Sequence, residues 1–85
     1  MSFLRGRRVP LAFILLTVRP GSEEKVVEEL KKLPAVKRVF RICGPYDILA
    51  ELEVEELSTL KEIVENRIRK IPENKSTLTM IALVS

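Results

Sequence analysis

The sequence predicts one α+β domain whose elements follow the order βαββαβ. Three observations support this: apolar strand-like runs flank two amphipathic helical stretches, Pro and Gly interrupt the junctions, and 85 residues suit a single domain. With 46% hydrophobic but only 5% aromatic residues, the core must consist mainly of Val, Ile and Leu. Right-handed crossovers would place both helices on one face of a four-stranded antiparallel sheet, which is the ferredoxin-like pattern.

The first strand and the first helix are separated by a turn of Arg, Pro and Gly. Residues 11–18 (LAFILLTV) are continuously apolar, as expected of a central strand that is covered on both faces. Ser22 is expected to cap the helix, whose first turn carries Glu23 and Glu24, where negative charge complements the helix dipole. Apolar residues then recur at helical spacing until Pro34 stops the helix.

The rest of the chain predicts a hairpin, a second helix and a last strand. Residues 36–43 (VKRVFRIC) and 48–54 (ILAELEV) alternate as strands do, with the turn Gly44-Pro45-Tyr46-Asp47 between them. Residues 55–71 have an acidic start, a basic end and a following proline, as a helix would. Residues 77–84 (TLTMIALV) are rich in β-forming side chains. The apolar stripe of the second helix consists of Leu57, Leu60, Val64, Ile68 and Ile71.

Both faces of the predicted sheet are apolar at its centre, although the two helices can cover only one of them. The strands at 11–18 and 77–84 each place aliphatic side chains on both sides. An exposed face of this kind would exceed the few hundred Å² of apolar patch that is typical of monomers. We therefore expect a homodimer that packs sheet against sheet, a dimeric α/β barrel, with an exposed monomer as the alternative.

The net charge of +3 comes from the N-terminus, where Arg5, Arg7 and Arg8 have no acidic neighbour. Of the 15 basic residues these three leave 12, which equals the number of acidic residues. A nucleic-acid-binding domain usually concentrates Lys and Arg on one face, so the balanced body argues against one. We expect residues 1–9 to form a basic flexible arm, with phosphate contact as the alternative. Many charges with few amides resemble a thermophile surface.

Residue types that carry chemistry are scarce in this chain. It has no His and one Cys, which excludes histidine-based catalysis, histidine metal ligands and an internal disulfide. We therefore predict no catalytic residue, no metal site and no cofactor. Cys43 lies in an apolar run and is expected to pack as a small buried hydrophobe. The run at 11–18 is too short to span a membrane and no cleavage site follows it, so we expect a cytoplasmic protein.

The turn at residues 44–47 carries two side chains that a bare hairpin does not need. In one interpretation Asp47 binds local backbone N–H groups while Tyr46 covers an edge of the sheet. In the other, the turn is a ligand loop whose carboxylate and backbone groups bind the charged ends of a free amino acid. Thr77 and Thr79, at the start of the last strand, either offer hydroxyls to the same region or are ordinary strand residues.

The chain resembles the effector-binding domain, or RAM domain, of the Lrp/AsnC (feast–famine) transcriptional regulators. The resemblance covers roughly residues 10–84 and is carried by LAFILLTVRPGSEEKVVEEL, LPAVKRVFRICGPYDILAELEV and RKIPENKSTLTMIAL. The Gly-x-Tyr-Asp hairpin, here Gly44, Tyr46 and Asp47, is the most distinctive motif of that family. Alone it would be a weak signal, but matching elements flank it on both sides.

The resemblance implies both an assembly and a ligand. Dimers of the family form through their sheets and assemble further, often into octameric rings. Amino acids or similar small effectors bind in clefts between dimers, which here implies Gly44, Tyr46 and Asp47 as ligand-binding residues, with Thr77 and Thr79 as further candidates. Full-length members carry an N-terminal helix-turn-helix domain, whereas only nine residues precede the first strand here. The resemblance thus implies that residues 10–85 form a stand-alone effector domain without direct DNA binding, which senses amino acids or assembles with a full-length regulator.

Three functions are consistent with the sequence. The first is a non-enzymatic, oligomeric, amino-acid-binding module linked to transcription. The second is a small cofactor-independent enzyme of the dimeric α/β-barrel type, similar to a monooxygenase, which would need polar groups lining a cavity where this chain has almost only aliphatic strand residues. The third is an assembly partner that binds no ligand.

Overall fold

The computed structural model describes residues 9–82, and their elements follow the predicted order. Residues 1–8 and 83–85 lie outside this description, and with them Arg5, Arg7 and Arg8 of the expected basic arm. The four strands form one antiparallel sheet in the order β2-β3-β1-β4. The elements are β1 (Val9–Val18), α1 (Glu23–Lys31), β2 (Val36–Arg41), β3 (Ile48–Val54), α2 (Leu57–Ile63), the π-helical turn η1 (Val64–Ile68) and β4 (Asn74–Ala82).

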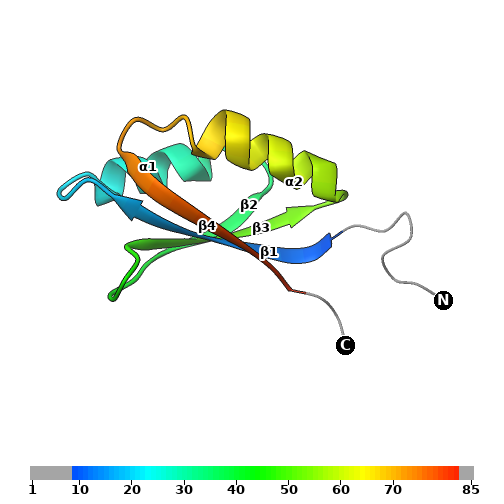
Figure 1. Ribbon diagram of the computed structural model, residues 1–85, viewed down its shortest axis with the longest axis horizontal. Coiled ribbons are helices and arrows are strands. Elements are labelled where there is room, and N and C mark those ends of the chain that lie inside the picture. The colour runs from blue at the N-terminus through cyan, green and yellow to red at the C-terminus, as the bar shows by residue number, and fades with distance from the viewer. Residues whose placement is uncertain (1–8, 83–85) are drawn as a thin grey trace.

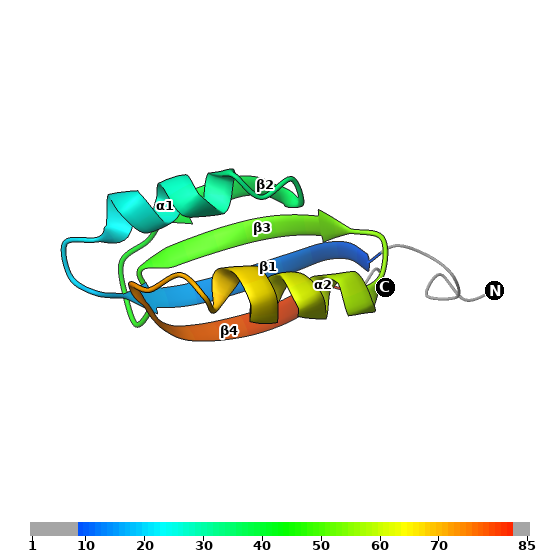
Figure 2. The same ribbon diagram turned by 90° about the horizontal axis from the view of Figure 1, so that it is seen from above.

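Both helices cover the same face of the sheet, which confirms the predicted ferredoxin-like fold (Figure 1). Seen from above, α1 lies over the β2 side of the sheet and α2 over the β1–β4 side (Figure 2). Every second residue of β1 points into this layer, and Ala12, Ile14 and Leu16 are fully buried there. Their partners on β3 and the helix residues Val26, Leu30, Leu60 and Ile68 complete an almost purely aliphatic core.

The opposite face of the sheet, called the open face below, is also apolar, as predicted. On β1 and β4 the residues of this face pair across the ladder, for example Phe13 with Met80 and Leu15 with Leu78. Phe40, Leu78 and Met80 are 41–43% exposed, because no helix covers this side. The apolar residues of the open face are Leu11, Phe13, Leu15, Phe40, Leu49, Leu78, Met80 and Ala82.

The second helix and the last strand differ from their predicted bounds. The helix begins at Leu57 rather than residue 55 and widens at its end into the π-turn, where the Arg69 N–H donates to the Val64 carbonyl at 2.8 Å. The predicted stripe residue Ile71 lies beyond the helix, although it is buried. β4 begins at Asn74, three residues before the predicted start, because the end of β1 continues the ladder as far as Val18 across a bulge.

Ser22 occupies the N-cap position of α1, as predicted, but its side chain makes no capping hydrogen bond; its hydroxyl donates to the Arg19 carbonyl in the preceding turn instead. The prediction for Cys43 is wrong. Cys43 is exposed rather than buried, because β2 ends at Arg41 and Cys43 already belongs to the following loop. A residue in that loop has no neighbouring strand to pack against, so the apolar run at 36–43 overstated the length of the strand.

Candidate ligand-binding site

The loop between β2 and β3 is closed by backbone hydrogen bonding at its base. The Ile42 N–H donates to the Asp47 carbonyl at 2.9 Å, which leaves residues 43–46 to turn the chain. Gly44 lies within them at a φ of +138°, a conformation that residues with a β-carbon rarely adopt. No atom lies within 4 Å of where its β-carbon would stand, so glycine is required here by backbone conformation and not by space.

Asp47 attaches this loop to the central strand. Its N–H donates to the Leu16 carbonyl at 2.9 Å, and its Oδ2 accepts from the Val18 N–H at 2.9 Å. The β1–β3 ladder ends at the pair Leu16–Ile48, so the carboxylate replaces the next backbone acceptor that β3 no longer supplies. Asp47 thus binds backbone, as the first interpretation of the turn expected, but that backbone is distant in sequence rather than local.

The remaining polar atoms of the loop have no partners within the described part of the chain. Oδ1 of Asp47 and the hydroxyl of Tyr46 make no hydrogen bond with residues 9–82, and both side chains are half-buried. The loop therefore presents one carboxylate oxygen and one phenol, next to a glycine whose backbone is open to approach. Such a set can accept from an ammonium group and donate to a carboxylate.

The structure does not bring Thr77 and Thr79 into contact with this loop. Thr77 pairs with Leu16 and Thr79 with Ile14 on β4, and β1 separates β4 from β3. Two strand spacings, about 10 Å, therefore lie between Thr77 and the loop at the same end of the sheet. Thr77 also accepts a hydrogen bond from Asn74 Nδ2 at 2.8 Å.

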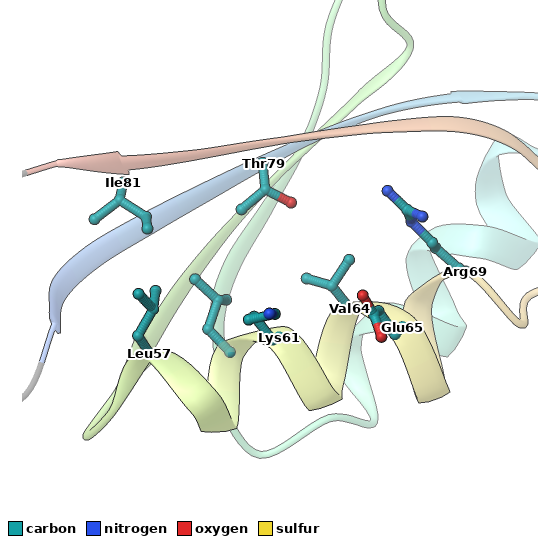
Figure 3. A pocket seen from close by; sticks show the side chains of 8 residues that line it. Leu57, Lys61, Val64, Glu65, Arg69, Thr79 and Ile81 are labelled. Carbon is teal, nitrogen blue, oxygen red and sulfur yellow. The ribbon is translucent and has the colours of Figure 1, made fainter.

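Thr79 lines a hollow between α2 and β4 that the sequence did not indicate. Figure 3 shows Leu57, Lys61 and Val64 on the helix facing Thr79 and Ile81 on the strand. The hollow has a volume of about 180 Å³, which is below the range of about 300–1,000 Å³ that is usual for ligand pockets. This hollow and three others lined by residues of the described part of the chain do not include Gly44, Tyr46 or Asp47.

The start of β4 is attached to α1 by an ion pair between Lys25 Nζ and Glu73 Oε2 at 3.0 Å. The Glu73 carbonyl also accepts from the Arg19 N–H at 2.9 Å. The hydrogen bond from Lys25 lowers the pKa of Glu73 below its ordinary value of 4.5. A carboxylate whose pKa is lower in the folded chain stabilises the fold above its unfolded pKa, and this contribution disappears as the pH falls through the folded pKa.

Glu73→Gln should therefore change how the free energy of unfolding depends on pH. We expect the difference in the free energy of unfolding between wild type and Glu73→Gln to be largest near neutral pH and to disappear as the pH falls through the lowered pKa of Glu73. Urea unfolding at several pH values measures it. Glu62→Gln, an exposed carboxylate on α2, is the control and should give a curve parallel to wild type. A constant offset for Glu73→Gln across the pH range would contradict the assignment.

The ion pair between Glu51 and Arg38 lies on the open face, beside its apolar centre. Glu51 is only 7% exposed although no helix covers it, and it lies between Phe13 of β1 and Arg38 of β2 in register. Arg38 Nε donates to Glu51 Oε1 at 2.6 Å, and this hydrogen bond raises the pKa of Arg38 above its ordinary value. The Arg38 guanidinium also lies 5.5 Å from the centre of the Phe40 ring. Alternation along residues 48–54 places Glu51 on the other side of the strand from Ala50 and Leu52, but it does not indicate that Glu51 is buried.

Other site classes find no support within residues 9–82. No group of His, Cys, Asp and Glu side chains in this part of the chain could hold a metal ion. None of the helices that the structure describes is both long enough and apolar enough to cross a membrane.

A family model described as the Lrp/AsnC ligand binding domain matches residues 11–85. An uncharacterised HTH-type transcriptional regulator of Pyrococcus horikoshii is 35% identical over 71 residues, covering 84% of this chain and 45% of the relative. The chain thus spans about half the length of the curated regulators that it matches. Homocitrate synthase of Sulfurisphaera tokodaii is 41% identical over 58 residues, but these cover 68% of this chain and only 12% of the enzyme.

Solved structures with the same fold agree with the match to the Lrp/AsnC ligand binding domain. The crystal structure of FFRP-DM1 superposes with a TM-score of 0.83 at 38% identity and is covered to 97% by 86% of this chain. A transcriptional regulator of Neisseria meningitidis in complex with L-Met has a TM-score of 0.83 at 17% identity, which shows the fold alone; 99% of this chain covers 56% of it. By sequence and fold together, this chain belongs to the Lrp/AsnC ligand-binding domain family.

Proposed function

We propose that this domain binds a free α-amino acid, or a similarly small zwitterion, at the loop of residues 44–47 and thereby modulates transcription. One observation carries the proposal: Asp47 fixes the loop to β1 through Oδ2 while Oδ1 and the Tyr46 hydroxyl keep their bonding capacity. A loop that is held rigidly but keeps polar atoms free can bind a ligand at a small cost in ordering.

We propose that other copies of the chain complete the site. The four hollows described above do not enclose Tyr46 or Asp47, both of which are only half-buried, and small-molecule sites normally bury most of their ligand. The apolar open face is best covered by a second copy, which gives a homodimer. Contacts between such dimers, up to an octamer, would supply the missing walls around the loop. In this arrangement Thr77 and Thr79 contribute only if another subunit brings them near the loop.

The ligand class and the link to transcription draw on the relatives. The Neisseria regulator was solved with L-Met, which supports an amino acid as the ligand of this fold. The Pyrococcus relatives are HTH-type transcriptional regulators, so we propose that this domain acts in the cytoplasm on transcription, through co-assembly with a full-length regulator. No catalytic step is proposed, because the core between the helices and the sheet consists of buried aliphatic side chains.

A thermal-shift screen with each of the standard amino acids tests the proposed ligand class. A ligand at about 100 times its Kd should add about 2.7 kcal/mol to the free energy of unfolding and raise Tm by roughly 11–22 °C. The N-acetylated amide of the same amino acid lacks both charged ends and should give no shift. Tyr46→Phe removes only the hydroxyl and should reduce the shift while leaving the Tm of the free protein nearly unchanged. A wild-type Tm that no amino acid changes at millimolar concentration would contradict amino-acid sensing.

A further inference from the structure

The Arg38–Glu51 pair is only partly satisfied within one chain. Arg38 uses its Nε–H on Glu51, while its terminal N–H groups and Oε2 of Glu51 make no hydrogen bond within residues 9–82. The Arg38 side chain remains 67% exposed, at the edge of a face whose centre on β1 and β4 is built from aliphatic and aromatic residues. The open face thus combines an apolar centre with a guanidinium and a carboxylate oxygen that have bonding capacity left within residues 9–82.

These leftover groups restrict what can cover the open face. A purely aliphatic partner would take the guanidinium out of water without supplying acceptors, and an unpaired buried charge is strongly unfavourable. The open face of a second copy offers what is missing, because it carries the same apolar surface and the same free donors and acceptor. In a two-fold dimer each contact occurs twice, so one complementary pair serves both subunits.

We propose that the Arg38–Glu51 pair selects a second copy of this chain as the partner of the open face. The inference rests on the sheet-to-sheet dimer proposed above. In the dimer, Arg38 of each copy donates to Glu51 of the partner subunit as well as to its own Glu51, which closes a four-membered network of charges. A chain of the same fold with apolar or differently charged residues at these two positions leaves a charge unpaired and is rejected.

A charge-exchanged variant tests the contact between copies. Arg38→Glu with Glu51→Arg preserves the pair within each chain and should form its own homodimer. Mixed in equal amounts with ¹⁵N-labelled wild type and left to exchange, it should form few heterodimers, because like charges then face each other twice. We expect the heterodimer share in native mass spectrometry to fall from the statistical half to about a tenth or less.

The controls separate this inference from the function on which it rests. Glu29→Lys with Lys32→Glu exchanges an exposed ion pair of 3.2 Å at the end of α1, on the other side of the sheet from the open face, and should mix statistically with wild type. Statistical mixing of the Arg38/Glu51 exchange overturns the inference while leaving the dimer intact. A wild type that stays monomeric at high concentration overturns the proposed assembly instead. If the exchanged chain does not fold, Arg38→Gln with Glu51→Gln replaces it, and statistical mixing of that variant with wild type overturns the inference equally.

Discussion

Met80→Glu should convert the assembly to monomers. Met80 lies on the open face opposite Phe13 and is 43% exposed in the single chain, so the carboxylate is tolerated while the chain is free. In a sheet-to-sheet dimer the same carboxylate is buried without a partner, twice by symmetry, at a cost of several kcal/mol for each charge. We expect the dimer Kd, measured by sedimentation equilibrium, to rise at least about a hundredfold.

Ile81→Glu is the matched control for Met80→Glu. Ile81 is the next residue of the same strand and has a similar exposure of 39%, but its side chain faces α2 on the other side of the sheet (Figure 3). The dimer should survive this substitution with an almost unchanged Kd. Equal loss of dimer in both variants would mean that strand stability, and not the open face, governs association.

The second large effect is expected at Asp47, where the fold and the proposed ligand depend on one carboxylate. Asp47→Ala leaves the part-buried Val18 N–H without its acceptor, which should lower the free energy of unfolding by about 1–3 kcal/mol. The same substitution removes the acceptor proposed for a ligand ammonium group. Loss of binding in this variant alone therefore does not distinguish a ligand contact from a disordered loop.

Asp47→Asn separates the two roles. The amide oxygen can still accept from the Val18 N–H, so the free energy of unfolding should stay within about 1 kcal/mol of wild type. The negative charge is lost, and amino-acid binding measured by calorimetry should weaken by at least about tenfold. Wild-type affinity in Asp47→Asn would place the ammonium group elsewhere. A variant as unstable as Asp47→Ala would mean that the charge itself holds the end of β1.

The fold could be predicted because its signals are local. The continuous apolar run of β1 and the breakers around the helices each depend on residues close together in the chain. Boundaries that depend on distant pairing were missed. β4 begins at Asn74 because β1 is still available to pair with it, and Cys43 is exposed because β2 has already ended. Neither fact follows from the apolar or polar character of the residues themselves.

Residues for a candidate site could be proposed from the sequence, but their geometry could not. The unusual side chains of the turn drew attention to Tyr46 and Asp47, yet the partner of Asp47 is Val18, 29 positions earlier. The burial of Glu51 depends in the same way on Arg38 across the hairpin. Alternation assigns Glu51 to a face of the sheet, but only the pairing of β2 with β3 shows that this acidic residue is shielded there.

The open face also connects the stability of this protein to its abundance. A small domain that leaves one face of its sheet uncovered is expected to have a small free energy of unfolding as a single chain. If association covers that face, mass action makes the folded fraction depend on how much protein is present. Dilution then both dissociates the assembly and lowers the folded fraction. A cell that makes little of this chain would therefore also keep a smaller fraction of it folded.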